Sequence, residues 1–246
     1  MPVFFIEESQ VDKGSVRITE PLNNHLQGSL RVKSGDEIDL VVPRQCRYRV
    51  RVERCDSNAL VGVIVDEQTY PCSQWPQIIL GQALLKGDRM DWLIQKASEL
   101  GASEIMPLVT RQSVVRPRDD RVQTQRERWD RIALEAAQQA ERWESPPVAA
   151  PIPADRFFCA HRPADVGLIL SERTNGQSLT TVRLPTAENH RVVIAVGPEG
   201  GWRPEEIGAA VECGFVPVTL GSKILRAETA GLAAITILQS RLGALG

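Results

Sequence analysis

RVVIAVGPEGGW, at residues 191–202, is the stretch that decides the fold of the C-terminal part of the chain. After Arg191 it runs through five β-branched or small apolar residues, as is typical of a strand buried on both faces of a parallel sheet. Three glycines, a proline and one carboxylate follow, and Pro204, Glu205 and Glu206 then suit the first turn of a helix. Glycine lets other groups approach the main chain closely, so this loop is a candidate ligand-binding loop.

The glycine-rich loop does not fit the common phosphate-binding patterns. A P-loop requires a lysine and a hydroxyl residue after its last glycine, and the dinucleotide fingerprint requires G-x-G-x-x-G, whereas this loop reads GPEGG. Glu199 at its centre would also repel a phosphate. Taken alone, the loop fits a tight strand-to-helix turn without a ligand as well as it fits a binding loop.

Strands and helices alternate on both sides of this stretch. Apolar runs predict strands at QIILGQALL, EIMPLV, VGLILSE and FVPVTLG, and helices are expected from about Pro204 and about Glu228. Residues 88–101 predict a helix with one apolar face, and residues 122–143 predict a second helix that carries Trp129 and Trp143. This alternation predicts an α/β domain with a mainly parallel sheet over residues 74–246.

The N-terminal part has a different pattern. Short apolar or alternating runs lie between residues 3 and 67, separated by polar turns, and their spacing predicts a small β-barrel over residues 1–70. Asp66–Gln77 contains two prolines and no periodicity, so we place the linker between two domains there.

Composition excludes several classes of protein. The 246 residues carry a formal net charge of −2, so a polyanionic partner would have to meet a local basic patch. The five cysteines lack a C-x-x-C pair, and the three histidines are far apart, so we expect neither a disulfide framework nor a metal site. No stretch approaches the ~20 apolar residues of a membrane span. The first residues, MPVFFIEESQ, do not resemble a secretory signal, so we expect a cytoplasmic protein.

A second loop follows the last predicted strand. LGSKILRAETAGLAAITILQ, at residues 220–239, passes from Gly221 through Ile224 and Leu225 to the head of a helix. Helix capping accounts for Glu228 and Thr229, but Arg226 near the positive end of a helix opposes the helix dipole. This cost favours an anionic partner for Arg226.

A basic stripe lies in RQCRYRVRVER, at residues 44–54. In a strand, Arg47, Arg49 and Arg51 project from one face while Tyr48, Val50 and Val52 face the core. The three guanidiniums fit a track for phosphates, and they also fit an ordinary solvated face that Glu53 continues. The residues that could extend this phosphate footprint are Arg31, Arg111, Arg116 and Arg118.

Together the two loops closely resemble the signature of a bacterial RNA methyltransferase family of the SPOUT superfamily, whose members methylate N3 of a uridine in 16S ribosomal RNA. The resemblance covers nearly the whole chain. It extends to HLQGSLRVKSGDEIDL (residues 25–40), LLKGDRMDWLIQKASELGASEIMPLVTRQSVV (residues 84–115) and RWDRIALEAAQQAER (residues 128–142).

The resemblance implies a PUA-like or OB-like barrel, an α/β domain with a trefoil knot, and a homodimer that acts on 16S rRNA or on the assembled small subunit. It also implies that S-adenosylmethionine lies among three loops within the knot. The cofactor-binding residues that it implies are Leu170, Ser171, Glu172, Gly197, Pro198, Glu199, Gly200, Gly201, Leu220, Gly221, Ile224, Leu225 and Thr229.

For the chemistry, we expect Arg226 to stabilise negative charge on the uracil or to orient a phosphate, with Glu199 or Glu228 as the base. The family usually has a hydroxyl residue where this chain has Arg203, so the cap of the following helix must come from elsewhere. Two other classes stay open at this point. A nucleotide-dependent oxidoreductase would need the missing dinucleotide fingerprint, and a non-catalytic RNA-binding module would not need two such loops.

Overall fold

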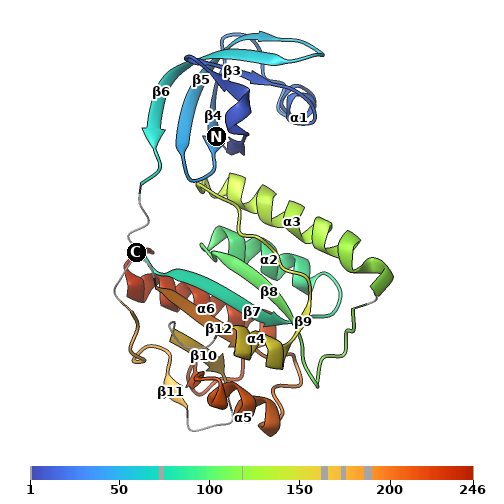
Figure 1. Cartoon of the computed structure of the whole chain (residues 1–246), viewed down its shortest axis with the longest axis vertical. Helices are drawn as coiled ribbons and strands as arrows, with labels where there is room; N and C mark the ends of the chain where they lie inside the picture. The colour runs from blue at the N-terminus through green and yellow to red at the C-terminus, as the bar shows by residue number, and fades with distance from the viewer. Residues whose placement is uncertain are drawn as a thin grey trace. The chain divides into compact units, whose positions relative to one another are not determined.

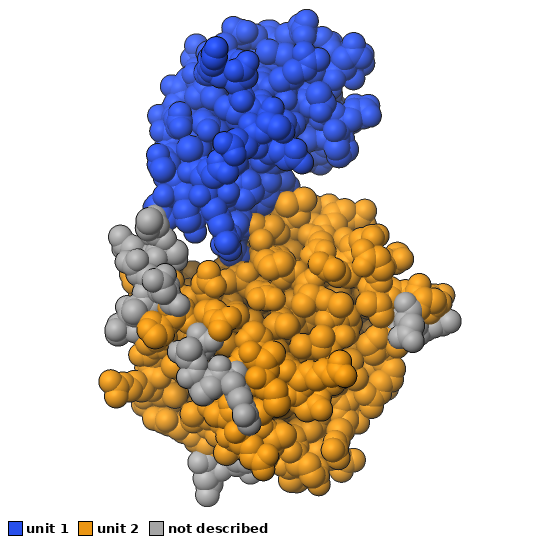
Figure 2. Space-filling model, viewed as in Figure 1, with its two compact units in different colours: residues 1–72, 137–144 blue, residues 73–136, 145–246 orange. Residues whose placement is uncertain are grey.

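The computed structural model describes residues 2–71, 75–117, 119–161, 166–172, 176–185 and 190–245, and the chain forms two compact units (Figure 2). Unit 1 contains residues 1–72 and 137–144, and unit 2 contains residues 73–136 and 145–246. Cys72, one of the five cysteines, and Arg118 lie outside the described residues.

Unit 1 is built on a curled mixed sheet of six strands in the order β1-β4-β5-β6-β3-β2. Only the β1 and β4 pair is parallel. The sheet packs on a core that includes Ile18, Leu26, Leu40, Val50 and Val52. The elements are β1 (Val3–Phe5), η1 (Glu8–Gln10), β2 (Val11–Asp12), β3 (Ser15–Ile18), α1 (Leu22–Gly28), β4 (Glu37–Val42), β5 (Cys46–Cys55) and β6 (Leu60–Thr69).

The curled sheet of unit 1 agrees with the predicted small barrel. No pairing between described residues joins the edge strands β1 and β2, so the sheet is an open half-barrel. Strand β6 runs on to Thr69, which shortens the expected linker at its first end.

The expected helix over residues 122–143 ends earlier than predicted. Helix α3 spans Val122–Gln139, and Glu141 takes a left-handed φ of 51°, which turns the chain out of the helix. Trp143 therefore does not pack as a helix residue. Its ring lies 5.6 Å from that of Tyr70 within unit 1, and the guanidinium of Arg47 stacks on it at 4.7 Å.

Unit 2 is built on a parallel sheet of seven strands in the order β11-β13-β10-β12-β7-β8-β9 (Figure 1). The predicted strands are confirmed, and two short edge strands join them. The strands are β7 (Gln77–Ala83), β8 (Glu104–Val109), β9 (Ile152–Pro153), β10 (Val166–Leu170), β11 (Gln177–Ser178), β12 (Arg191–Val196) and β13 (Val216–Thr219).

Helices cover both faces of this sheet. On one face α2 (Arg89–Glu99), α3 and α6 (Ala227–Leu242) bury one apolar core. On the other face α4 (Ala154–Ala160) and α5 (Pro204–Glu212) bury an aromatic core with Phe157, Phe158 and Phe215. Gly81 of β7 lies under this second core and leaves room for it, since a Cβ at this position would approach the ring of Phe157 to 2.5 Å. A short 3-10 turn, η2 (Asp119–Arg121), precedes α3.

Among the described residues, none of the helices combines the length and the apolar character that crossing a membrane requires.

Candidate functional site

Three loops meet where the neighbouring strands β13, β10 and β12 end. Because the strands are parallel, their carboxyl ends share one edge of the sheet, where ligands bind in α/β folds. The loops enclose a cavity of about 360 Å³. The described residues that line it are Gln112, Leu170, Ser171, Glu172, Val196, Gly197, Pro198, Glu199, Gly200, Gly201, Trp202, Ile207, Ile224, Leu225, Arg226, Ala227 and Ala230.

Two glycines explain the shape of the GPEGG loop. Gly201 has a φ of 74°, a conformation that strains any other residue, and its N–H donates to the carbonyl of Pro198 at 2.8 Å. A Cβ on Gly197 would lie 3.0 Å from the indole nitrogen of Trp202. That indole N–H donates to the carbonyl of Leu170 at 3.0 Å, so Trp202 ties the loop after β12 to the end of β10.

Glu199, in the middle of this loop, forms an ion pair with a residue of helix α2. Arg89, the first residue of α2, places Nη1 2.9 Å from Oε1 of Glu199, and the two side chains are 42% and 31% exposed. Arg89 was not among the residues predicted from the sequence. Its position at a predicted helix start was visible in the sequence, but its partner lies 110 residues away.

The third loop ends at Arg226, which is the N-cap residue of α6. The side chain of Arg226 is exposed, lines the cavity, and has no hydrogen bond or ion pair with any described residue. Ile224 is 74% exposed at the same cavity. An arginine without a described partner and an exposed apolar side chain thus lie together at the cavity. Both can contact a ligand that has charge and apolar surface.

The remaining predicted residues of this loop are placed differently. Leu220, Gly221 and Thr229 are not among the described residues that line the cavity. Glu228 is 7% exposed in the first turn of α6, and its buried Oε2 has no hydrogen-bond partner among the described residues. Glu228 also does not line the cavity, so of the two carboxylates considered as a base, Glu199 is the one at the cavity.

The cap of α5 comes from a side chain other than that of Arg203, as we expected, and this side chain lies in the first turn of the helix itself. Glu206 is 8% exposed, and its two oxygens accept the backbone N–H of Arg203 and the backbone N–H of Arg111, each at 2.9 Å. The same carboxylate therefore caps the helix and holds the segment after β8. The next residue, Gln112, packs against Gly200, where an added Cβ would lie 3.0 Å from its Oε1.

The arginines of the basic stripe alternate with core residues as predicted, but each already has a partner within unit 1. Arg49 pairs with Asp39 at 3.2 Å, and Arg51 pairs with Glu37 at 2.9 Å. The hydrogen bond and charge of Asp39 raise the pKa of Arg49. Arg47 donates to the carbonyl of Glu141 and stacks on a tryptophan ring.

Four further arginines were predicted to extend the stripe, and three of them, all but Arg118, are among the described residues. Arg31 is exposed, with a left-handed φ of 56°. Arg116 donates to the carbonyl of Thr110 at 3.0 Å, and the guanidinium of Arg111 has no hydrogen bond or ion pair with a described residue. No group of three or more potential metal ligands occurs among the residues that the structure describes.

Comparisons with known proteins agree with this architecture. Residues 73–239 match the RNA methyltransferase domain family. Ribosomal RNA small subunit methyltransferase E of Synechocystis sp. is 31% identical over 240 residues, covering 96% of this chain and 77% of that relative. The Bacillus subtilis protein of the same name is 30% identical over 245 residues, covering 96% of this chain and 95% of its own.

Two similar solved structures contain the cofactor. The ribosomal RNA small subunit methyltransferase E of Neisseria gonorrhoeae, bound to S-adenosylmethionine, has a TM-score of 0.87 and 32% identity, with 98% of each chain covered. A methyltransferase of Legionella pneumophila in complex with the same cofactor has a TM-score of 0.85 and 25% identity, with 97% of each chain covered.

Proposed function

The chain belongs to the ribosomal RNA small subunit methyltransferase E family, and from this premise we propose that it methylates N3 of a uridine in 16S rRNA with S-adenosylmethionine as donor. The observation that carries the proposal is the convergence of three strand-end loops on one cavity, in a fold whose relatives bind this cofactor. We also propose that the enzyme works in the cytoplasm as a homodimer.

The cavity suits a sulfonium nucleoside in size and chemistry. Its volume of about 360 Å³ lies within the ~300–1,000 Å³ of typical ligand pockets. Val196, Ile207 and Leu225 offer apolar surface for an adenine and a methionine chain. The carboxylates of Glu172 and Glu199 offer acceptors for ribose hydroxyls or an ammonium group.

In this proposal most of the cofactor contacts come from main chain. The residues proposed to hold the cofactor are those of the three loops, Leu170–Glu172, Gly197–Gly201 and 220–225, with Thr229 as a further candidate. When bound, S-adenosylmethionine supplies an electrophilic methyl group, and the loops hold it in line with the uracil nitrogen. Such positioning can lower the barrier by about 7–11 kcal/mol, compared with roughly 3–5 kcal/mol from a general base.

Arg226 and the two carboxylates have proposed catalytic roles. Arg226 lies at the cavity without a partner among the described residues. We assign it the role of stabilising the negative charge that develops on the uracil as N3 loses its proton. Glu199 is the better placed acceptor for that proton, because it lines the cavity. Glu228, buried in the first turn of α6, is the alternative base.

RNA contacts are proposed for six arginines. Arg49 and Arg51 would have to exchange Asp39 and Glu37 for RNA phosphates, and Arg47 would have to leave its tryptophan. Exposed ion pairs are worth about 0–1 kcal/mol, so a phosphate can displace them. The other members of the proposed set, Arg31, Arg111 and Arg116, need no such exchange of ion pairs with described residues.

The test is transfer of isotope-labelled methyl from S-adenosylmethionine to 16S rRNA, presented both as naked RNA and as assembled small subunits. Mass mapping should place the label on N3 of a single uridine. Arg226→Ala should lower turnover while calorimetry gives an unchanged cofactor affinity. Binding of RNA without methyl transfer to either substrate would refute the proposal in favour of an RNA-binding module.

A further inference from the structure

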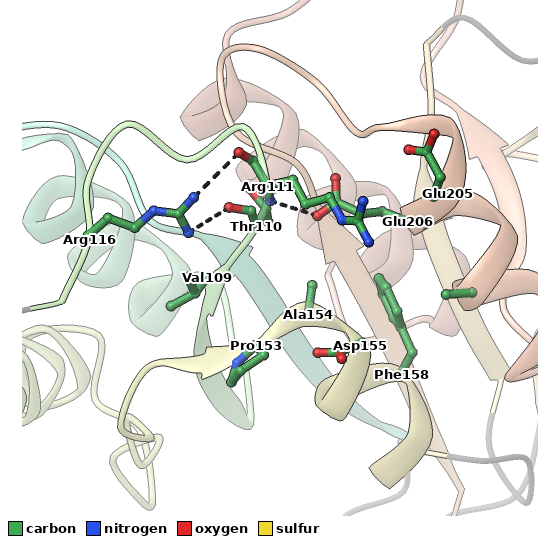
Figure 3. Close-up of a pocket in the computed structure, with 11 residues that line it drawn as sticks. Val109, Thr110, Arg111, Arg116, Pro153, Ala154, Asp155, Phe158, Glu205 and Glu206 are labelled. Atoms are coloured by element: carbon green, nitrogen blue, oxygen red, sulfur yellow. Dashed lines mark hydrogen bonds between the residues drawn. The ribbon is translucent and has the colours of Figure 1, made fainter.

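A second cavity, of about 300 Å³, lies next to the cofactor cavity in unit 2 (Figure 3). It opens where β8 and β9 end, between the first turns of α4 and α5. The described residues that line it are Val109, Thr110, Arg111, Arg116, Pro153, Ala154, Asp155, Phe158, Glu205, Glu206 and Ala209. None of the cofactor-binding roles proposed above uses these residues.

One wall separates the two cavities. Arg111 lines the second cavity and the adjacent Gln112 lines the first. The same division holds on α5, where Glu206 and Ile207 line the second and the first cavity in turn. Ligand groups in the two cavities would therefore contact residues that are adjacent in the sequence.

Opposite charges face each other across the second cavity. The guanidinium of Arg111 and the carboxylate of Asp155 lie on opposite sides of it, with the ring of Phe158 beside them (Figure 3). No ion pair joins Arg111 to Asp155. Oδ1 of Asp155 accepts the N–H of Arg156 at 2.9 Å, and Oδ2 has no hydrogen bond with a described residue. The cavity thus offers one cation and one acceptor that no described partner satisfies.

The other charged groups of this cavity are already in use or lie near its edge. Both oxygens of Glu206 accept backbone N–H groups, and Arg116 donates to the carbonyls of Thr110 and Arg111. Glu205 is exposed and adds a third carboxylate to the lining, beside Asp155 and Glu206. The carboxylates disfavour a ligand that is only an anion, and the charges make the cavity a poor site for a purely apolar ligand, so the lining suits a ligand that carries both an anionic group and hydrogen-bond donors.

We propose that this cavity binds a nucleotide that flanks the methylated uridine, with the phosphate on Arg111 and a base amino group on Asp155. Unpaired RNA bases are commonly read along their hydrogen-bonding edges, and a carboxylate accepts from exocyclic amino groups. Guanine suits Asp155 best, because its N1–H and amino group can donate side by side to a carboxylate. The subsite rests on the proposed function, since it assigns specificity to the same reaction.

The subsite has a direct binding test. RNA fragments that contain the target uridine are titrated with the full-length protein, for wild type, Arg111→Ala and Asp155→Asn. Matched controls are Arg156→Ala, which removes an exposed arginine outside the cavity lining, and Glu212→Gln at the far end of α5. We expect Arg111→Ala to weaken RNA binding about tenfold and to flatten its salt dependence. Both controls should bind RNA like wild type.

A base-replacement series then locates the flanking nucleotide. Each nucleotide near the target uridine is replaced in turn by an abasic residue, and each guanosine by inosine, which lacks the amino group. At one position the loss should match that of Asp155→Asn and should not add to it in the variant. Additive losses at every position, or unchanged affinity in both Arg111→Ala and Asp155→Asn, would overturn the subsite.

Kinetic readouts separate this proposal from the proposed function. Methyl transfer by the wild-type protein tests the reaction, whereas the binding series tests the subsite even if no methyl is transferred. In an active enzyme, Arg111→Ala should raise KM for RNA by more than it lowers kcat. Cofactor affinity by calorimetry should stay within twofold of wild type, and Arg111→Lys should recover part of the lost RNA affinity.

Discussion

Replacing Glu206 with alanine is expected to destabilise unit 2 strongly, because this one carboxylate holds two backbone segments. Its oxygens accept the N–H groups of Arg111 and Arg203 at 2.9 Å each, and the side chain is only 8% exposed. Hydrogen bonds to a charged group contribute about 1.5–3 kcal/mol each, so two of them give about 3–6 kcal/mol. Arg111 and Arg203 are exposed residues whose N–H groups can reach water once released, which favours the lower end of that range.

Urea unfolding at neutral pH measures the loss of stability. Glu206→Gln keeps one acceptor oxygen and should lose about half as much as Glu206→Ala. Amide hydrogen exchange gives the local signature, since the amides of Arg111 and Arg203 should exchange much faster in Glu206→Ala. Glu212→Ala, at the exposed end of the same helix, is the control and should cost less than about 0.5 kcal/mol. A loss below about 1 kcal/mol in Glu206→Ala, with Arg111 still protected, would refute the reasoning.

Three further predictions concern single features of the two units. Arg89→Ala should change the free energy of unfolding by less than about 1 kcal/mol, since the ion pair with Glu199 is partly exposed. The same variant should slow methyl transfer, and a turnover equal to that of wild type would show that the pair has no role in the reaction. Gly201→Ala should cost about 1–2 kcal/mol of strain at a φ of 74° and weaken cofactor binding in calorimetry, whereas Gly208→Ala, in open space within α5, should be neutral or stabilising. Backbone N–H groups of the β5–β6 turn hold the pKa of Asp56 below its ordinary value of 3.8, so its stabilising effect is present above that pH and is lost as pH falls through the lower folded-state pKa. The difference in thermal midpoint between wild type and Asp56→Ala should therefore be largest at neutral pH and shrink towards pH 3, and a difference that does not change with pH would contradict this assignment.

The strands of unit 2 could be predicted because their signal is local. A strand buried on both faces reads as a continuous apolar run, and β7, β8, β10, β12 and β13 all do so. The short helices α1 and α4 were missed, since seven residues carry too few turns to show an apolar face. The end of α3 was also missed, because it depends on the left-handed Glu141 and on contacts that Trp143 makes with a distant part of the chain.

The glycine-rich loops were visible in the sequence, but the groups that fix them were not. The pair of Arg89 with Glu199 and the bond from Trp202 to Leu170 span 110 and 32 residues. No periodicity or spacing reports such contacts. The trefoil knot and the homodimer were implied by resemblance alone, and both stay predictions.

The wall between the two cavities has a consequence for how cofactor and RNA binding are linked. Glu206 ties the start of α5 to Arg111, and the adjacent Gln112 packs against Gly200 of the cofactor loop. A ligand that orders the segment from Arg111 to Gln112 therefore also orders one wall of the other cavity. The second ligand then meets a wall that is already fixed, and this lowers the entropy cost of its binding. Coupling of this kind is reciprocal. The factor by which the cofactor raises the affinity for RNA therefore equals the factor by which RNA raises the affinity for the cofactor. The link runs through backbone hydrogen bonds to one carboxylate. Glu206→Gln should therefore weaken the coupling more than it weakens the binding of the cofactor alone or of RNA alone.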